Sequence, residues 1–161
     1  MKDATTQQRS PVVIHATVTM LACSVLLGAC GGAETGPEEQ LRQWVTIANQ
    51  AAEAKERRKL VGMISPAYAD PRGNDRDDIE VLLRFYFLRQ HRIKLLTSID
   101  DVRLYGDSAA EIDLTVGMAG TKDSDFGFSA DAYRFALELE LNGDEWQLIG
   151  ARWGKLGGEL H

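Results

Sequence analysis

Cysteine is scarce in this sequence, and both cysteines lie near its start. The two are Cys23 and Cys30 among 161 residues, so the chain after Cys30 contains no thiol. Disulfides, iron–sulfur clusters and cysteine-ligated zinc sites are therefore excluded from the body of the protein. Histidine is also rare, with three in the chain, and no pair has the spacing of a metal motif. We expect neither a metal nor a cofactor.

Basic residues are fewer than acidic ones, with 18 Lys and Arg against 24 Asp and Glu. The formal net charge is −6, with 26% charged and 44% hydrophobic residues, which are ordinary values for a globular protein. Nucleic-acid binding needs a basic face, so the acidic balance argues against it, and equally against electrostatic adhesion to anionic lipid. The sequence also lacks a phosphate-binding glycine loop and the HExxH and GxSxG motifs. These absences weigh against kinase, metalloenzyme and hydrolase functions.

No apolar run is long enough for a typical membrane-spanning helix. The longest, Val12 to Leu27, falls short of the roughly 20 residues needed to cross a bilayer. It follows Lys2 and Arg9 and ends in small residues, an order typical of a secretory signal peptide. The alternative is a core helix that ends in a cysteine by chance.

The end of this run, Leu27-Gly28-Ala29-Cys30, resembles the lipobox of bacterial lipoproteins. The resemblance implies cleavage between Ala29 and Cys30 and attachment of lipid to the Cys30 thiol, with several acyl chains forming a firm membrane anchor. Gly31 follows in place of the aspartate that retains enterobacterial lipoproteins in the inner membrane. We therefore expect a signal peptide over 1–29, a lipidated cysteine and short tether over 30–37, and a location at the outer membrane facing the periplasm.

Two helical segments should follow the tether. Apolar residues recur at three- and four-residue steps from Leu41, predicting a helix that begins near Pro37 and runs to about Arg58, with an irregular continuation to Ile64. Its start should carry a capping box formed by Thr35 and Glu38. After a loop over 67–74, Asn74 should cap a second helix that ends at His91. The apolar face of that helix comprises Ile79, Leu82, Leu83, Tyr86 and Phe87.

After His91 the apolar period changes from 3.6 to 2, which indicates strands. Alternating segments begin at Ile93, Ile112, Tyr133 and Glu145. A register change predicts a bulge near Asp100-Asp101. Turns are expected at 106–107 and at Asn142-Gly143, and a polar loop over 121–130. The fold class is therefore α+β: N-terminal helices packed on a four-stranded antiparallel sheet as a two-layer domain over 38–153, with a flexible tail over 154–161.

This pattern resembles the nuclear-transport-factor-2-like, or SnoaL-like, superfamily. The resemblance rests on the long first helix, Tyr68-Ala69-Asp70, the YFLRQH segment ending at His91, and a last hairpin closing on Trp146 and Trp153. It implies a curled sheet wrapped around helices as a cone with a pocket at its open end. Enzymes of the superfamily isomerise, dehydrate or hydrolyse small apolar molecules in that pocket. Helix-then-strand order is shared with cystatin-like folds.

Three residues are weak candidates for catalysis. Asp70 with Tyr68 could form an acid–base pair, although an aspartate before Pro-Arg-Gly more often bonds its own backbone in a turn. His91 could act as a base, or could serve only as a favourable charge at a helix end. Asp123, Asp125 and Asp131 crowd one loop, but its spacing does not match a calcium loop and a solvated loop is the simpler interpretation.

Two further sets of residues have both functional and structural interpretations. The basic run at Lys55, Arg57, Arg58 and Lys59 could touch lipid headgroups or simply complement a helix dipole. The aromatic residues could line a ligand pocket or pack the core; they are Trp44, Tyr86, Phe87, Tyr133, Phe135, Trp146 and Trp153.

These observations favour a non-catalytic envelope lipoprotein that binds a partner protein or a small apolar ligand near the membrane. The alternative is an isomerase or dehydratase with a pocket in the cone, using Asp70, Tyr68 or His91. A third possibility is a structural subunit that dimerises through its sheet. The outward residues Arg134, Glu138 and Glu140 should be solvated, which counts against that possibility.

Overall fold

The computed structural model describes residues 35–121 and 128–161. The predicted signal peptide, its cleavage after Ala29 and lipidation at Cys30 lie outside these residues. Three helices come first: α1 (Pro37–Glu53), α2 (Arg57–Gly62) and α3 (Arg76–Arg89). Four strands follow: β1 (Arg92–Tyr105), β2 (Ala109–Thr121), β3 (Phe128–Asn142) and β4 (Glu145–Lys155). The predicted α+β class is confirmed. Within the described residues, no helix is both long enough and apolar enough to span a bilayer.

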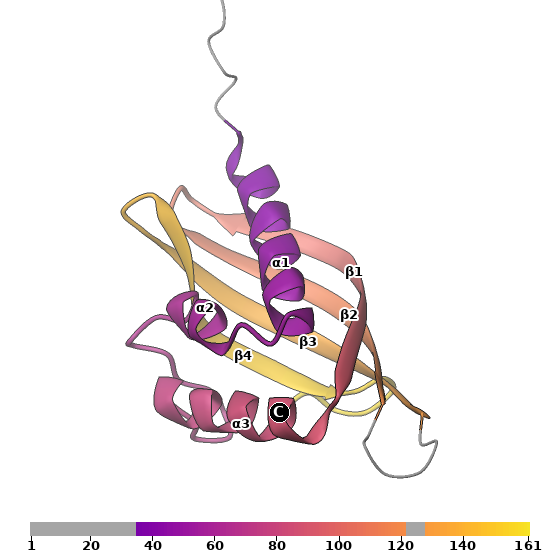
Figure 1. Cartoon of the computed structure of the whole chain (residues 1–161). Helices are drawn as coiled ribbons and strands as arrows, with labels where there is room; N and C mark the ends of the chain where they lie inside the picture. Colours follow the sequence, from indigo (N-terminus) through magenta and orange to yellow (C-terminus); the bar gives the residue numbers. More distant parts are fainter. Residues whose placement is uncertain (1–34, 122–127) are drawn as a thin grey trace, which may run out of the picture. The chain divides into compact units, whose positions relative to one another are not determined.

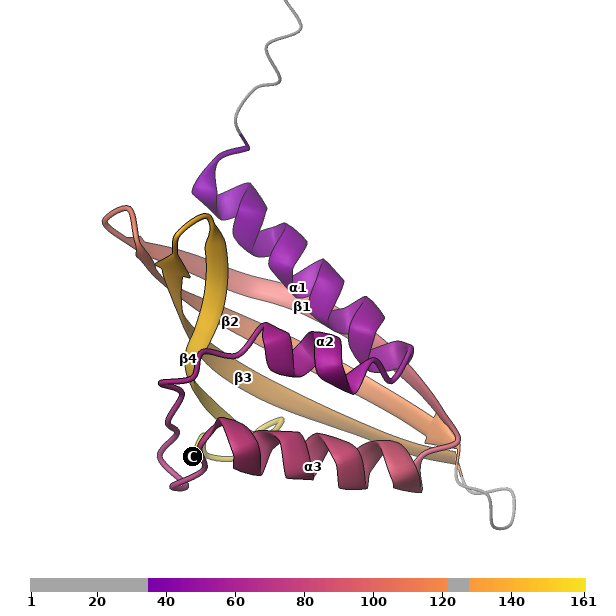
Figure 2. The same ribbon diagram turned by 60° about the vertical axis from the view of Figure 1, so that its left-hand side comes forward.

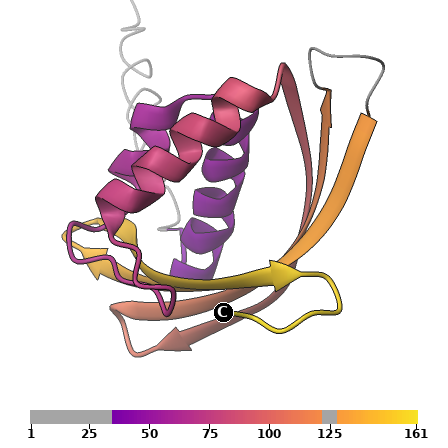
Figure 3. The same cartoon turned by 90° about the horizontal axis from the view of Figure 1, so that it is seen from below.

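The strands form one antiparallel sheet in the order β1-β2-β3-β4, so each strand pairs with its neighbour in sequence. The sheet curls, and all three helices lie on its concave side (Figures 1 and 3). The predicted bulge is confirmed by a register shift between Ile99 and Asp101. A second register shift lies between Glu138, which pairs with Gly150, and Leu139, which pairs with Leu148. The register therefore passes over Ile149 on β4. Bulges increase strand bending and therefore contribute to the curl.

The first helix differs from the prediction at both ends. Its N-cap is Gly36 and no side chain caps it, so the capping box expected at Thr35 is wrong. Instead, the Thr35 carbonyl accepts a hydrogen bond from the Gln40 side chain. The helix stops at Glu53 rather than near Arg58 because Lys55 adopts a left-handed backbone conformation, with φ of 58°. This break separates α2 from α1 and changes the direction of the chain.

The cap of α3 lies one residue later than predicted. Asp75, not Asn74, is the N-cap, and its side chain accepts hydrogen bonds from the backbone of Asp77 and Asp78 while Asp78 completes a capping box. The side-chain amide of Asn74 instead donates a hydrogen bond to Asp70 in the preceding loop. The helix also ends at Arg89, two residues before the predicted end at His91.

The last hairpin occurs where expected, but its loop is shifted by one residue. Asn142 pairs with Glu145, so the loop consists of Gly143 and Asp144, and only Gly143 has positive φ (64°). Strand β3 begins at Phe128, inside the predicted loop. After β4 the chain turns back, and the backbone of His161 exchanges hydrogen bonds with that of Trp153.

The most completely buried part of the core lies where α1 crosses the sheet. Leu41, Ile112 and Leu139 are its most completely buried large side chains. The predicted alternation along β2 and β3 is confirmed there, because Ile112 and Leu139 point inward. On the opposite face of the sheet, Arg134, Glu138 and Glu140 are exposed as expected. A charged network crosses that face from β1 to β4; it includes the ion pairs of Arg103 with Asp113 and Arg152 with Glu111.

Candidate functional site

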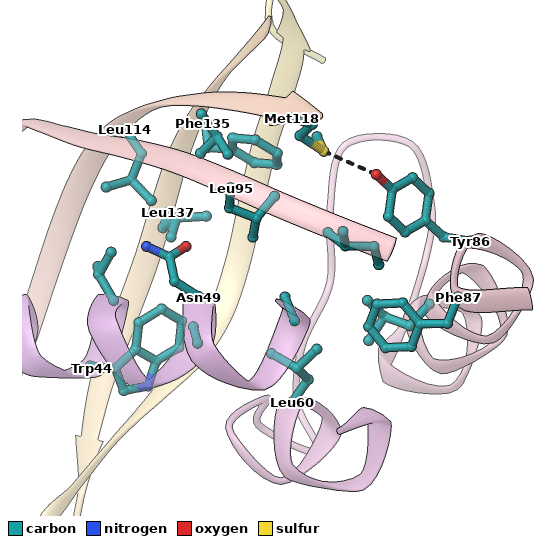
Figure 4. Close-up of a pocket in the computed structure, with 16 residues that line it drawn as sticks. Trp44, Asn49, Leu60, Tyr86, Phe87, Leu95, Leu114, Met118, Phe135 and Leu137 are labelled. Atoms are coloured by element: carbon teal, nitrogen blue, oxygen red, sulfur yellow. Dashed lines mark hydrogen bonds between the residues drawn. The ribbon is translucent and has the colours of Figure 1, made fainter. Parts of the chain in front are cut away.

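A cavity of about 320 Å³ lies between the helices and the concave face of the sheet, and we call it the main cavity. Figure 4 shows side chains from α1, α2, α3, β1, β2 and β3 that surround this space. The lining residues are Trp44, Val45, Ala48, Asn49, Ala52, Leu60, Leu83, Tyr86, Phe87, Ile93, Leu95, Leu114, Val116, Met118, Phe135 and Leu137.

The cavity exists because the helices do not fill the curl of the sheet. On its cavity side α1 presents Ala48 and Ala52, whose methyl groups occupy little space. None of the residues of α3 is fully buried, and Figure 2 shows this helix on the same side of the sheet as α1 and α2. Apolar side chains from α3 therefore line a space instead of interlocking with the sheet. Interiors are usually packed to crystal-like density, so a hollow of this size is notable.

Two polar side chains interrupt the apolar wall. The hydroxyl of Tyr86 donates a hydrogen bond to Sδ of Met118 over 3.5 Å, and burial raises the pKa of Tyr86, helped by nearby Tyr133 and Asp131. The hydroxyl therefore stays protonated at neutral pH. Across the cavity, Oδ1 of Asn49 accepts a hydrogen bond of 3.0 Å from Thr97 on β1. The Asn49 amide nitrogen carries two further donors.

None of the described residues that line the main cavity is an aspartate, glutamate, histidine, lysine or arginine. General acid–base catalysis needs a titratable group within hydrogen-bond reach of the proton that moves. Tyr86 is the one ionisable side chain in this lining, and its raised pKa keeps it protonated, so it supplies no base at neutral pH. The wall of the main cavity is therefore apolar, with neutral polar groups only at Tyr86 and Asn49 among the described residues.

A second cavity of about 440 Å³ lies between α3 and strands β3 and β4, and we call it the side cavity. It shares Leu83, Tyr86, Phe135 and Leu137 with the main cavity. At its edge, the guanidinium of Arg72 lies 4.2 Å from the centre of the Trp153 ring.

The predicted pair of Tyr68 and Asp70 is brought together, but in a structural arrangement. The Tyr68 hydroxyl lies 3.3 Å from Oδ2 of Asp70, which also accepts a hydrogen bond from the Asn74 side chain. Oδ1 of Asp70 accepts from the backbone N–H groups of Arg72 and Asn74, both at 2.9 Å. The carboxylate therefore organises the loop before α3, as expected of an aspartate in a turn.

The pKa values in this pair also disfavour proton transfer at neutral pH. Burial acts to raise the pKa of Asp70, but the hydrogen bonds from Asn74, Arg72 and Tyr68 outweigh it and hold the pKa below its usual value. Burial, together with the charge of Asp70, raises the pKa of Tyr68 far above its usual value. Asp70 is thus a weak base and Tyr68 a weak acid. Tyr68 does line the side cavity, whereas Asp70 does not.

The two histidines within the described residues, His91 and His161, line neither cavity. His91 is exposed between α3 and β1 and is part of neither lining. His161 is exposed near the surface, where its imidazole lies 3.9 Å from Glu159.

The basic run of the sequence holds the helices together. The ammonium of Lys55 donates to the backbone carbonyls of Phe87 and Gln90 at the C-terminal end of α3, where the helix dipole favours a positive charge. Arg57 forms an ion pair with Glu80, which also lies on α3. The left-handed conformation of Lys55 therefore both ends α1 and fixes the position of the helix that covers the cavities.

The acidic loop is only partly described. Asp123 and Asp125 lie outside the described residues, and Asp131 lies 3.6 Å from the ammonium of Lys155. Within the ranges described, no group of three or more acidic, histidine or cysteine side chains could hold a metal ion.

The aromatic residues divide between the cavities and the core. Trp44, Tyr86, Phe87 and Phe135 line the main cavity, while Trp146 is buried and donates from its indole to Gln40. Sequence reasoning did not single out Asn49. The sequence signal for Asn49 is a polar residue between Ala48 and Ala52 on an otherwise apolar helix face. Polar residues at helix ends and on exposed helix surfaces give the same pattern, so it does not identify a site.

Comparison with known proteins places the fold. No protein-family model matches the chain, and no curated protein matches it in sequence. Solved structures do match. A candidate scytalone dehydratase from Novosphingobium aromaticivorans superposes with a TM-score of 0.68 at 8% identity, covering 73% of this chain and 83% of its own. A ketosteroid isomerase-like protein from Erwinia carotovora atroseptica superposes with a TM-score of 0.61 at 11% identity, and the match covers 73% of this chain and 94% of its own.

A third structure is a candidate dehydratase of the NTF2-like family from Streptomyces avermitilis. It gives a TM-score of 0.63 at 15% identity and covers 73% of this chain and 95% of its own. At such low identities the likeness shows the fold alone. The chain therefore has the nuclear-transport-factor-2-like fold, as its sequence pattern suggested.

Proposed function

We propose that this domain binds a small, mainly apolar molecule in the main cavity and does not transform it. The observation that carries the proposal is a cavity of about 320 Å³ whose wall is apolar except for Tyr86 and Asn49. Ligand sites are typically apolar hollows of about 300–1,000 Å³ with a few placed polar groups. Of the two kinds of partner that the sequence left open, a cavity between layers favours a small molecule over a protein.

N-Phenyl-1-naphthylamine, a neutral probe that fluoresces in apolar surroundings, tests this proposal. We expect saturable fluorescence with the purified protein. Ala48→Phe should fill part of the main cavity and weaken probe binding at least about tenfold, the equivalent of 1.4 kcal/mol. Thr46→Phe adds the same ring to an exposed position of the same helix and should leave binding unchanged. Equal binding to both variants would contradict the proposal.

The second candidate function is an isomerase or dehydratase, which the named activities of the structural neighbours support at the level of fold. A base that abstracts a proton from carbon in an apolar pocket should also open the ring of 5-nitrobenzisoxazole, a reaction followed by absorbance. Because the lining of the main cavity lacks such a base, we expect no saturable acceleration. Acceleration that is lost in Asp70→Asn or His91→Gln would favour the enzyme.

We further propose that the domain is held at the membrane through lipid on Cys30, facing the periplasm from the outer membrane. The support for this proposal is the order of charge, apolar run, small residues and cysteine over residues 2–30. A lipid anchor followed by a short tether would keep the cavities close to a source of apolar molecules.

A further inference from the structure

The main cavity and the side cavity share one partition. Leu83 and Tyr86 from α3 and Phe135 and Leu137 from β3 line both. These four side chains therefore lie between the two spaces, beneath the same helix. An elongated apolar molecule that displaced them slightly would have room on either side, and the two volumes, about 320 and 440 Å³, are both available to it.

The side cavity differs from the main cavity by having a cation at its edge. Arg72 is exposed, stacks on the Trp153 ring at 4.2 Å and donates one hydrogen bond of 2.8 Å to the Trp153 backbone carbonyl. A guanidinium carries five N–H donors in a planar fork that matches a carboxylate. The ring and the Trp153 carbonyl therefore hold the guanidinium in place, and its other donors bond no atom of the described residues.

The neighbouring carboxylate does not neutralise this cation through a direct ion pair. Both oxygens of Asp70 are already occupied: Oδ1 by the backbone of Arg72 and Asn74, and Oδ2 by the side chains of Tyr68 and Asn74. Among the described residues, no acidic side chain lies within ion-pair distance of the Arg72 guanidinium.

We infer that the ligand is a single-chain anionic amphiphile, a fatty acid. Its carboxylate binds the Arg72 guanidinium beside Trp153, and its hydrocarbon chain runs through the side cavity, past Tyr86, into the main cavity toward Trp44. Charge supports this orientation, because the cation lies at the side cavity and the walls of the main cavity, beyond the shared partition, are apolar. The inference rests on the proposed function and specifies its ligand class.

Laurate and dodecanol, which have the same chain length and different head groups, test the role of Arg72. We expect Arg72→Gln to weaken laurate binding about tenfold, the equivalent of 1.4 kcal/mol, and to leave dodecanol unchanged. Arg72→Lys, which keeps the charge but not the planar fork, should bind laurate with an affinity between those of the original protein and Arg72→Gln. Arg84→Gln removes an exposed arginine of α3 that lines neither cavity and is the matched control.

Orientation is tested by tryptophan quenching with fatty acids that carry a nitroxide near the carboxyl group or near the methyl end. The first should quench fluorescence that Trp153→Phe removes, and the second should quench fluorescence that Trp44→Phe removes. The reverse order, or equal effects of Arg72→Gln on laurate and dodecanol, would overturn the inference. The proposed function fails separately, if Ala48→Phe does not weaken binding of the neutral probe.

Discussion

The hydroxyl of Tyr86 on α3 points to Sδ of Met118 on β2, 3.5 Å away, inside the main cavity (Figure 4). A thioether sulfur is a weak hydrogen-bond acceptor, so this hydroxyl loses little hydrogen-bond free energy when it turns toward a ligand oxygen. The bond also links the covering helix to the sheet at a point where the two are otherwise separated by the cavity. Tyr86 is therefore placed to donate a hydrogen bond to the ligand that we propose for this cavity.

Replacing Tyr86 by phenylalanine should separate polar from apolar recognition. We expect Tyr86→Phe to weaken binding of 2-naphthol by about threefold to tenfold, because one neutral hydrogen bond contributes about 0.5–1.5 kcal/mol. Binding of naphthalene, which has no oxygen, should not change. Fluorescence titration measures both. A similar loss for the two ligands would show that the hydroxyl does not contact the bound molecule.

Lys55 should control how firmly α3 covers the cavities. Lys55→Met keeps the bulk of the side chain but removes the ammonium from the carbonyls of Phe87 and Gln90. We expect amide hydrogen exchange over residues 86–90 to become about fivefold faster, from the loss of about 1 kcal/mol of helix-end stabilisation. Lys59→Met, which disturbs only an exposed pair with Glu56, is the control. Unchanged exchange at the end of α3 would contradict this role.

Asp70 should stabilise the fold in a pH-dependent way. Because its pKa is lower in the folded than in the unfolded chain, its contribution is fully present above about pH 4 and is lost as pH falls through the folded-state pKa. We expect Asp70→Asn to lower the free energy of unfolding by about 2 kcal/mol at pH 7 and by much less near pH 2. Denaturant titrations at the two pH values measure this.

The matched control for Asp70 is Asp107→Asn, at an exposed position in the turn between β1 and β2. Its effect should stay within about 0.5 kcal/mol at both pH values. A constant effect of Asp70→Asn across the pH range would mean that the carboxylate charge does not stabilise the loop.

The proposed anchor depends on one thiol. In a bacterial host, mass spectrometry of the protein from the membrane fraction should find a chain that begins at Cys30 and carries acyl mass. Cys30→Ser should accumulate as the uncleaved precursor without acyl mass, whereas Cys23→Ser should mature normally. Cleavage at the same bond in Cys30→Ser would contradict lipoprotein processing.

Much of the fold could be predicted from local patterns. Alternation along β2 places Ile112, Leu114 and Val116 on one face, and a one-residue change of register at Asp100 produces a bulge, because side chains alternate strictly along a strand. Each of these signals is contained within a few consecutive residues, so no knowledge of the partner elements is needed to interpret them.

The breaks and the cavity could not be predicted in this way. Lys55 leaves the helical conformation at a position where its ammonium contacts the end of α3, and this contact joins residues more than thirty positions apart. Asp75 caps α3 in place of Asn74, whose side chain donates to Asp70 in the folded loop. Likewise, Tyr86 has the sequence pattern of a core residue. Whether its ring meets another side chain or an empty space depends on how far α3 stands from the sheet.

Methyl NMR of the four methionines of the chain tests the central claim most directly. Met118 lines the main cavity. Met63 lies outside it, directly after α2, where its carbonyl accepts a hydrogen bond from the backbone of Leu148 on β4. With [¹³C-methyl]methionine protein, we predict that N-phenyl-1-naphthylamine shifts the Met118 signal in a saturable way and leaves the Met63 signal in place. Saturable binding that moves Met63 and not Met118 would contradict a ligand site between the helices and the sheet.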